Sequence, residues 1–538
     1  MSMPPTYKIH AMTNGSLSSS GSQPSREPAR WLLPSIADLI FLALLGVLTF
    51  TPLSVRLLAD AGIGWHIRTG QAILASHAVP RVDTFSTTMN GKPWLAWEWL
   101  DDLKVGGLDS AFGLNGVVWF TALAIAAVFS GMFQFLVSRK TNLFAALALV
   151  LLAISASMIH FLARPHVLSW FFTLLWFWIL DSPERGCGSD GGLSTRFLWI
   201  LPVSMLIWVN VHGGFLFGFA LIGIFWLGSV WTWSRSSNTR IEDSLRKIAA
   251  GQHARTLTSV GFVSVLASFV NPYGWKLHKH VISYLSNRFL IDHIDEFQSP
   301  NFHGIAQKCF LMLLLISIAA LIARGRKLSA SQILVVLFAV YAGLYASRNI
   351  PISAILLGMV IGPLLPSSGS RESFPQRMFA VEARMRGHLW IVAGIVLTFA
   401  IVANGGRVGS AQWIDAHFDP QRMPVQAVDY LRSQRAAEPI LAPDYWGGYL
   451  IYRLYPQVQV VVDDRHDLYG EQFFRSYLRF LHADQGWNEF LREHPADYII
   501  LPRKSAMATV LMELRGWKTI YGDDVAVVFQ RTDRQAHR

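Results

Sequence analysis

Cysteine is almost absent from this sequence, with two residues in 538, Cys187 and Cys309. They form no spaced set, so no disulfide framework is predicted. Charged side chains are also scarce, at 15% of the chain against about 25% in a typical soluble domain. Hydrophobic residues make up 52%. These shortages argue against an ordinary soluble protein and favour a chain that places apolar segments in a bilayer.

Internal repeats are not visible, which counts against a transporter built from inverted repeats. No short motif as diagnostic as a P-loop is present either. Lys and Arg (46) outnumber Asp and Glu (35), which gives a net charge of +11. Because these cations concentrate in short gaps between apolar runs, we interpret the charge as a topology signal. Nucleic-acid binding is not predicted.

Eleven long apolar runs are what the sequence does contain. Most are long enough to cross a hydrocarbon core of about 30 Å, which takes about 20 helical residues. Backbone groups in lipid must pair within the chain, so we predict helices. The runs are 33–55, 115–137, 142–160, 165–181, 196–211, 213–233, 256–270, 308–323, 329–346, 350–366 and 387–404.

The distribution of Lys and Arg predicts the orientation of these spans. Alternate gaps are cationic, such as those holding Arg139 and Lys140 or Arg324 and Lys327, and these belong in the cytoplasm. The first run has no small-residue cleavage site and is predicted to be an uncleaved signal anchor. We therefore predict a disordered cytoplasmic tail over 1–30, a transmembrane domain over 31–405 with a large first outer loop at 56–114, and a soluble α/β extracytoplasmic domain over 406–538.

The first outer loop begins with an amphipathic pattern. Ile63, Ile67 and Ile73 recur at helical spacing, which predicts a helix near the membrane surface. Asp60 stands just before this helix. A carboxylate there can be a simple cap. It can also be a base held at the membrane edge, where a lipid-linked substrate would present its head group.

Two further acids follow in the same loop. Asp83 lies in the polar stretch PRVDTFSTTMNG, which has hydrogen-bonding groups but no core-forming residues. Glu98 is surrounded by Trp94, Trp97 and Trp99 in WLAWEWLDD. Tryptophan is common at the bilayer interface, so these rings need no function. A carboxylate beside apolar rings is desolvated, however, and rings beside acids are a common surface for sugars.

Cations and histidines mark the later outer corners. Arg164 precedes one span and Arg348 lies between two others, and a guanidinium fork matches the oxygens of a phosphate. Snorkelling to the interface is the ordinary alternative for both. We predict that the outer corners bind substrate through His66, Arg164, His166, Asn210, His212 and Arg348. No cofactor is predicted with certainty. A divalent metal held by Asp60, Glu98 or the scattered histidines remains open, because no tight ligand spacing is present.

The composition changes near Val408 to that of a globular domain. Short β-branched runs alternate with amphipathic stretches, which predicts a small α/β unit. Two segments, DYWGGYL and DDRHDLYG, are dense in polar groups that include Asp444, Asp463, Asp464 and Asp467. They fit turns that close a sheet onto the membrane unit as well as a ligand site, and we favour the structural interpretation.

This arrangement resembles the GT-C superfamily of integral-membrane glycosyltransferases. The resemblance covers the architecture of nearly the whole chain. In sequence it rests on the first loop, where Asp60, Trp65-His66, Pro80, Asp83, Phe85-Ser86, Trp94 and Glu98-Trp99-Leu100 are similar to the loop of bacterial members.

The resemblance implies transfer of a sugar from a polyprenyl-phosphate carrier to a lipid, glycan or protein acceptor, with inversion, at the outer face of a bacterial inner membrane. Asp60 would be the general base. Many members have a second acid beside the first, but here the neighbours are Ala61, Gly62, Ile63 and Gly64. Asp83 and Glu98 are therefore rivals for the base or a metal ligand. Alternatives are a transporter or flippase, a polysaccharide polymerase or ligase, and a non-catalytic envelope scaffold.

Overall fold

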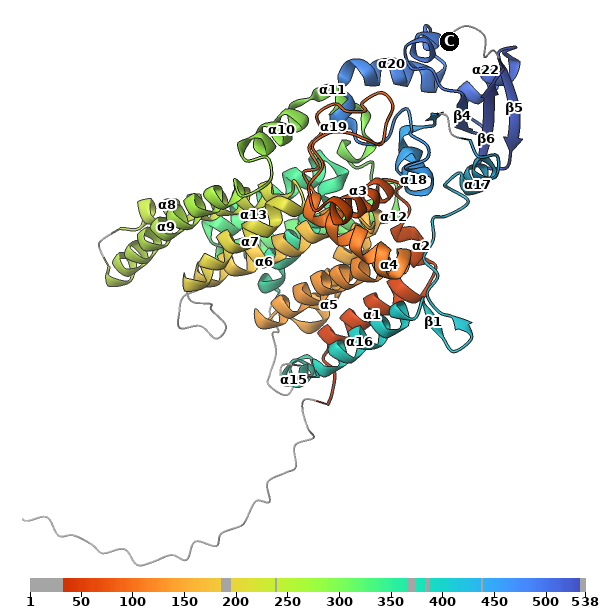
Figure 1. Ribbon diagram of the computed structural model, residues 1–538. Helices are drawn as coiled ribbons and strands as arrows, with labels where there is room; N and C mark the ends of the chain where they lie inside the picture. Colours follow the sequence, from red (N-terminus) through yellow and green to blue (C-terminus); the bar gives the residue numbers. More distant parts are fainter. Residues whose placement is uncertain are drawn as a thin grey trace, which may run out of the picture.

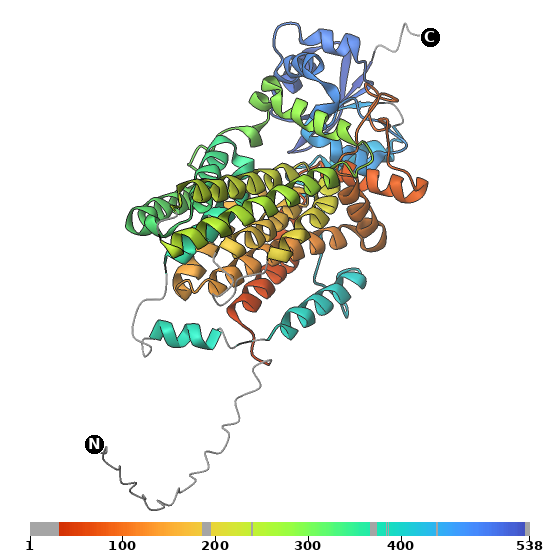
Figure 2. The same ribbon diagram turned by 90° about the vertical axis from the view of Figure 1, so that its left-hand side faces the viewer.

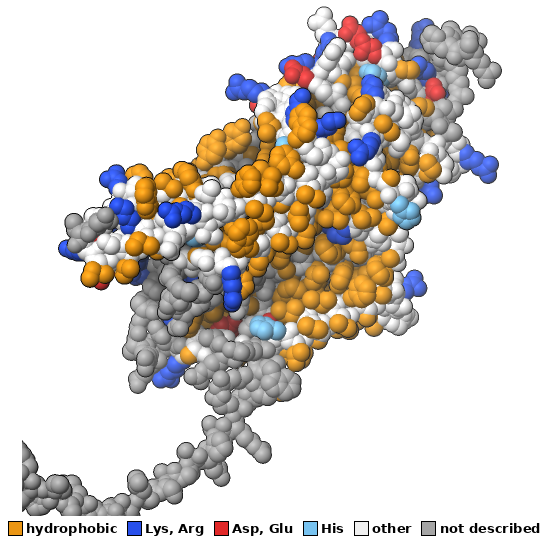
Figure 3. Space-filling view, turned by 60° about the vertical axis from the view of Figure 1, so that its left-hand side comes forward, with side chains coloured by type: hydrophobic (Ala, Val, Ile, Leu, Met, Phe, Trp, Pro, Cys, Tyr) orange, Lys and Arg blue, Asp and Glu red, His pale blue; other side chains and the backbone are white. Residues whose placement is uncertain are grey.

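A computed structural model describes residues 32–184, 195–237, 240–365, 374–382, 385, 387–436 and 439–532. The tail 1–30 and Cys187 lie outside these residues. The described chain forms a helical body with a smaller α/β domain at one end (Figure 1). Hydrophobic side chains cover much of the helical body, and many charged ones lie toward its ends (Figure 3).

The helical body runs from α1 to α16, and each predicted apolar run overlaps one of its helices. Among the described residues, five helical stretches are long and apolar enough to cross a membrane, and four shorter apolar helices accompany them. The protein is thus an α-helical polytopic membrane protein, as predicted, while the number of eleven spans stays a prediction. The helices are α1 (Ile36–Phe50), α2 (Leu53–Leu57), α3 (Ile63–Ser76), α4 (Trp99–Ser138), α5 (Leu143–Ser157), α6 (His166–Glu184), α7 (Ile200–Val211), α8 (Phe215–Arg235), α9 (Ile241–Ser268), α10 (Trp275–Ser286), α11 (Arg288–His293), α12 (Ile305–Arg324), α13 (Ala330–Tyr345), α14 (Ile350–Ile361), α15 (Phe374–Glu382) and α16 (Leu389–Ala403), with short 3-10 turns at Met158–His160, Thr195–Trp199, Asp295–Phe297, Gly325–Lys327, Ser347–Asn349 and Gly362–Leu364.

Local sequence explains several helix starts. Ser35 and Asp38 form a capping box at the start of α1, and Ser329 and Gln332 form one at α13. The helix α4 begins at Trp99, well before the predicted span at 115, because it contains a surface segment followed by a break. The break lies at Gly113, whose φ of 62° is accessible to glycine without a Cβ clash.

The C-terminal domain holds a four-stranded sheet in the order β3-β4-β6-β5. β3 pairs parallel to β4, and the other neighbours are antiparallel. The runs ADYIILP and VAVVFQR form β4 and β6 as predicted, whereas VQVVVDD contributes only single bridges from Val460. The elements are α17 (Val425–Ser433), β3 (Ile440–Leu441), α18 (Asp444–Leu454), α19 (His466–Tyr469), α20 (Glu471–His482), α21 (Trp487–Glu493), β4 (Tyr498–Pro502), α22 (Ala506–Glu513), β5 (Trp517–Gly522) and β6 (Ala526–Arg531), preceded by a hairpin of β1 (Arg407–Val408) and β2 (Ala411–Gln412).

The C-terminal domain is docked on the first loop, residues 56–114 (Figures 1 and 2). Helix α3 packs against α18 so closely that a Cβ at Gly64 would overlap the carbonyl of Gly448. The backbone of Val460 exchanges hydrogen bonds with Phe85 and Thr87, which extends the domain's sheet by one bridge into the loop. The loop is therefore fixed between the helical body and the domain, and it brings both to one site.

Candidate functional site

A cavity of about 490 Å³ lies where the helical body, the first outer loop and the C-terminal domain meet. One wall is apolar, with Leu216, Phe217 and Phe338 from the helices. The remainder combines tryptophans with charged side chains. These lining residues include Trp65, Trp94, Trp97, Glu98, Arg164, His166, His212, Glu296, Arg348, Asp464, Arg465 and Asp467.

Asp60, Arg164 and Asp464 form a cluster beside this cavity. Arg164 Nη1 donates to Asp60 Oδ2 at 2.7 Å, and Arg164 Nη2 lies 3.9 Å from Asp464 Oδ2. The other oxygen of Asp60 accepts from the backbone N–H of Gly62 at 2.8 Å, and Asp464 Oδ1 accepts from Trp65 Nε1 at 2.9 Å. Two carboxylates from distant parts of the chain therefore flank one guanidinium.

The two carboxylates crowd each other. A Cβ at Gly62 would overlap Asp464 Oδ2 and lie 3.0 Å from Asp60 Oδ1. Burial and the negative charge of Asp60 raise the pKa of Asp464 to about 7, although Arg164 opposes the shift. Asp60 has the shorter ion pair with Arg164, and Asp464 takes up a proton near neutral pH.

Glu98 occupies the tryptophan-lined part of the cavity between two histidines. Its oxygens lie 3.8 Å from His66 Nε2 and 3.7 Å from His212 Nε2. Burial, with a further contribution from Asp101, raises the pKa of Glu98 to about 8. Glu98 is therefore a neutral acid at pH 7 that can both donate and accept a hydrogen bond.

The two histidines beside Glu98 are held in different ways. His66 is fully buried, its Nδ1 is 2.5 Å from Asp102 Oδ1, and its Nε2 has no hydrogen-bond partner among the described residues. His212 Nδ1 accepts from the backbone N–H of Gly214 at 3.0 Å, so its proton is on Nε2, which faces Glu98. Burial lowers the pKa of both rings well below the ordinary value.

Arg348 provides a second cation in the cavity. Its Nη1 lies 3.2 Å from Glu296 Oε1, and its guanidinium covers the ring of Phe297. Burial opposes ionisation of Glu296, but Arg348 and Arg164 outweigh it and lower its pKa to about 2. His166 also lines the cavity and donates through Nε2 to the carbonyl of His160 at 2.9 Å. The predicted residues Glu98, Arg164, His166, His212 and Arg348 therefore line one space. His66 does not line it but is fully buried beside Glu98, at 3.8 Å.

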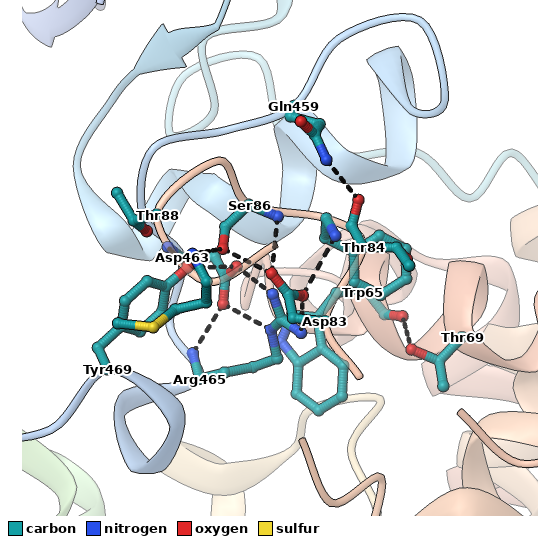
Figure 4. Close-up of polar contacts among 12 residues, drawn as sticks. Trp65, Thr69, Asp83, Thr84, Ser86, Thr88, Gln459, Asp463, Arg465 and Tyr469 are labelled. Carbon is teal, nitrogen blue, oxygen red and sulfur yellow. Dashed lines mark hydrogen bonds and ion pairs between the residues drawn. The ribbon is translucent and has the colours of Figure 1, made fainter. Parts of the chain in front are cut away.

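Asp83 and Asn210 are placed differently from the other predicted residues. Asp83 is completely buried, accepts from Ser86, and lies 2.7 Å from Arg465 Nη1, which joins the first loop to the C-terminal domain (Figure 4). Asn210 accepts from Trp99 and donates to two backbone carbonyls. Neither residue lines the cavity. Their hydrogen-bonding groups are used within the protein, which fits a structural role for both.

Asp464 is a site residue that the sequence pattern did not single out. The density of acids in DDRHD was a signal, but the same residues also suit a turn. Asp463 does have the structural role, because it accepts from Arg465 and Tyr469 (Figure 4). The neighbouring Asp464 points instead toward Arg164 and the cavity.

The residues offer little support for a bound metal. In the part of the chain that the structure describes, no three His, Cys, Asp or Glu side chains are grouped closely enough to hold a metal ion. The carboxylates of Asp60 and Asp464 already share the cation of Arg164. This pair is therefore not a ready-made site for a divalent ion.

Comparison with known proteins identifies the fold. No protein-family model and no curated protein sequence matches the chain. The chain is similar to the Archaeoglobus fulgidus oligosaccharyltransferase tethered to an acceptor peptide with the NVT sequon, with a TM-score of 0.52 and 11% identity over 87% of this chain and 68% of that one. The same enzyme in complex with Zn and sulfate gives a TM-score of 0.50 and 10% identity, over 92% of this chain and 73% of that one.

ArnT from Cupriavidus metallidurans bound to undecaprenyl phosphate gives a TM-score of 0.45 and 12% identity, over 94% of this chain and 98% of that one. Both proteins are membrane glycosyltransferases of the GT-C superfamily. At 11% identity the likeness to the oligosaccharyltransferase is one of fold. The GT-C resemblance of the sequence is therefore confirmed at the level of the fold.

Proposed function

We propose that this protein is a membrane glycosyltransferase that moves a sugar from a polyprenyl-phosphate carrier to an acceptor. The observation that carries the proposal is the cavity, which combines arginines, a tryptophan wall with Glu98, and the Asp60–Arg164–Asp464 cluster. These are the groups needed for a phosphate, a sugar and an acceptor hydroxyl. The oligosaccharyltransferase with the same fold was crystallised with an acceptor peptide, which supports a transfer reaction.

The phosphate of the carrier binds between Arg164 and Arg348 in this proposal. Both guanidinium groups are partly exposed in the cavity. A departing phosphate gains negative charge, and fixed cations in a partly dry cavity stabilise that charge. The apolar wall formed by Leu216, Phe217 and Phe338 suits the first isoprene units of the carrier.

The sugar lies against Trp65, Trp94 and Trp97. Tryptophan rings stack on the apolar faces of a sugar, and Glu98 with His212 can exchange hydrogen bonds with its hydroxyls. His66 lies next to Glu98, with its buried Nε2 3.8 Å from the Glu98 carboxyl group.

The reaction is a displacement with inversion at the anomeric carbon. A carboxylate of the cluster accepts the proton of the acceptor hydroxyl, a contribution of about 10²- to 10⁴-fold to the rate. Asp60 is required because it holds Arg164 in place. The acceptor is a lipid, a glycan or a protein.

We propose that the reaction takes place on the outer face of a bacterial inner membrane, with the N-terminus in the cytoplasm and the C-terminal domain outside. The support is the distribution of Lys and Arg in the sequence. The first loop and the C-terminal domain lie at the same end of the helical body (Figures 1 and 2). Residues of both line the cavity.

The test uses purified protein in detergent with radiolabelled polyprenyl-phosphate sugars and total membrane lipids as acceptor. Wild-type protein is expected to transfer or release the label, and Asp60→Asn to lose most of this activity while remaining folded and inserted. Full activity of Asp60→Asn would remove this residue from the mechanism. Failure of wild-type protein to bind any of the donors would favour a transporter of another solute or a scaffold.

A further inference from the structure

We infer that Asp464, from the C-terminal domain, is the carboxylate that accepts the proton of the acceptor hydroxyl, and that Asp60 instead positions Arg164. This inference rests on the proposed function. It assigns the catalytic base to a residue outside the first loop. It also makes the C-terminal domain a part of the active site.

The hydrogen bonds of the two carboxylates carry the argument. Both oxygens of Asp60 are engaged, one by Arg164 Nη1 at 2.7 Å and the other by the N–H of Gly62 at 2.8 Å. Asp464 uses only Oδ1, which accepts from Trp65 Nε1. Its Oδ2 receives no hydrogen bond from any described residue, and Arg164 Nη2 is 3.9 Å away. Asp464 therefore has a lone pair free for a substrate hydroxyl.

The position of Asp464 supports the same assignment. Asp464 lines the cavity that holds Arg164, Arg348 and Glu98, whereas Asp60 does not belong to its lining. A proton acceptor must come within about 2.6–3.2 Å of the hydroxyl that it deprotonates. An acceptor oxygen next to Asp464 Oδ2 would also be next to Arg164, where the phosphate is proposed to leave.

The backbone that presents Asp464 is held firmly. The preceding Asp463 accepts two hydrogen bonds from the Arg465 side chain, at 2.8 and 2.7 Å, and one from Tyr469 at 2.9 Å. Arg465 in turn binds Asp83 of the first loop. This buried network fixes the turn, so Asp464 needs no large movement to meet a substrate.

The electrostatic surroundings suit a base that works near neutral pH. The charged groups around Asp464 are Asp60 before α3, Arg164 before α6, and its chain neighbours Asp463 and His466. Burial and Asp60 raise its pKa to about 7, while Arg164 and His466 act in the opposite direction. Asp60 is instead held by Arg164 in an ion pair of 2.7 Å.

The chemical step is balanced without a metal or a redox partner. The acceptor oxygen forms a bond to the anomeric carbon as its proton moves to Asp464 Oδ2. The bond from that carbon to the phosphate oxygen breaks, and its electron pair leaves with the polyprenyl phosphate. Protonated Asp464 then loses the proton to water.

The experiment compares wild type, Asp464→Asn, Asp60→Asn and the control Asp429→Asn in the full-length protein. The donor is undecaprenyl phosphate carrying a radiolabelled hexose, pentose or aminosugar, and binding is measured separately with undecaprenyl phosphate. Asp464→Asn keeps the acceptor for Trp65 and should retain binding. Its transfer rate should fall by about 10²- to 10⁴-fold. Asp429 pairs with Arg453 in the same domain away from the cavity, so its variant should transfer normally.

The pH dependence separates the two carboxylates. The wild-type rate should rise with pH through about 7, because the base works in its ionised form. The residual rate of Asp464→Asn should lack this rise, and in Asp60→Asn the rise should move to lower pH because a repelling charge is gone. If wild type transfers the sugar and folded Asp464→Asn is fully active, the inference is overturned. The role of proton acceptor would then return to Asp60. Absence of both binding and transfer in wild type would overturn the proposed function itself.

Discussion

Asp60, Arg164 and Asp464 show how single residues from three parts of the chain share one task. The guanidinium of Arg164 lies between both carboxylates, 2.7 Å from Asp60 and 3.9 Å from Asp464. It also lines the cavity. In our account the same guanidinium holds the acids in place and faces the phosphate of the donor.

Replacement of Arg164 by Gln should therefore affect binding and proton uptake together. Binding of undecaprenyl phosphate should weaken by about tenfold or more, since a charge-assisted contact of about 1.5–3 kcal/mol is lost. The loss of the cation should also raise the pKa of the carboxylate pair, so the rise of rate with pH moves upward. The measurement is a binding titration with a pH–rate profile. Unchanged binding would exclude Arg164 from the phosphate site, and Arg453→Gln serves as the control.

Glu98 gives a prediction about stability. Burial raises its pKa from 4.5 to about 8, so between these values the folded protein holds a proton that the unfolded chain releases. The contribution of Glu98 to the free energy of unfolding therefore falls as pH rises through this range. Glu98→Gln is always neutral, so its apparent Tm should exceed that of wild type at pH 8 but not at pH 4.5. A variant that is less stable than wild type at pH 8 would contradict this environment for Glu98.

At the scale of elements, the first outer loop connects the helical body to the C-terminal domain. Its backbone pairs with Val460, and its buried Asp83 binds Arg465. The turn at 463–465 depends on the same arginine. The loop thus determines where Asp464 lies, although its own acid Asp83 does not reach the cavity.

Asp83→Asn should act through this connection and not through chemistry. Removing one partner of a buried ion pair typically costs about 3–5 kcal/mol, whereas an exposed pair such as Asp429–Arg453 is worth about 0–1 kcal/mol. The variant should show a lower apparent Tm and faster proteolysis of the C-terminal domain than Asp429→Asn. If Asp83→Asn were as stable as wild type and yet inactive, Asp83 would have a direct role in the reaction.

The sequence predicted elements better than contacts. Helix α3 followed from the spacing of Ile63, Ile67 and Ile73, and β4 and β6 followed from their β-branched runs. Periodicity reports which face of an element is buried, not which distant element covers it. The bond between Trp65 and Asp464 joins residues 399 positions apart, so no local pattern could reveal it.

At the scale of the molecule, the charged site lies at one end of a largely apolar helical body, where the C-terminal domain covers it (Figures 1 and 3). A flippase or transporter needs polar groups that reach through the body and alternate in access. Among the described residues, the ionisable side chains that line the cavity lie instead at the end of the body that carries the first loop and the C-terminal domain. This arrangement suits chemistry on a head group at one membrane face.

The proposed orientation predicts a labelling pattern. Cys187 and Cys309 are first replaced by Ser, and single cysteines are then placed at two exposed positions, Ser433 in the C-terminal domain and Gln252 in α9. In intact bacterial cells with a permeable outer membrane, a membrane-impermeant maleimide should label Ser433→Cys and leave Gln252→Cys unlabelled until the cells are lysed. The reverse pattern would place the site in the cytoplasm.

The most direct test of the central claim is a product analysis in proteoliposomes that contain an undecaprenyl-phosphate-linked radiolabelled sugar and total membrane lipids. Our account predicts that wild-type protein breaks the bond between sugar and phosphate. The labelled product, either a glycolipid or free sugar, should appear in the same amount as undecaprenyl phosphate. The transferred sugar should have the inverted configuration at its anomeric carbon. Intact donor that is bound, or moved between leaflets without cleavage, would contradict the claim and identify a carrier of lipid-linked sugars.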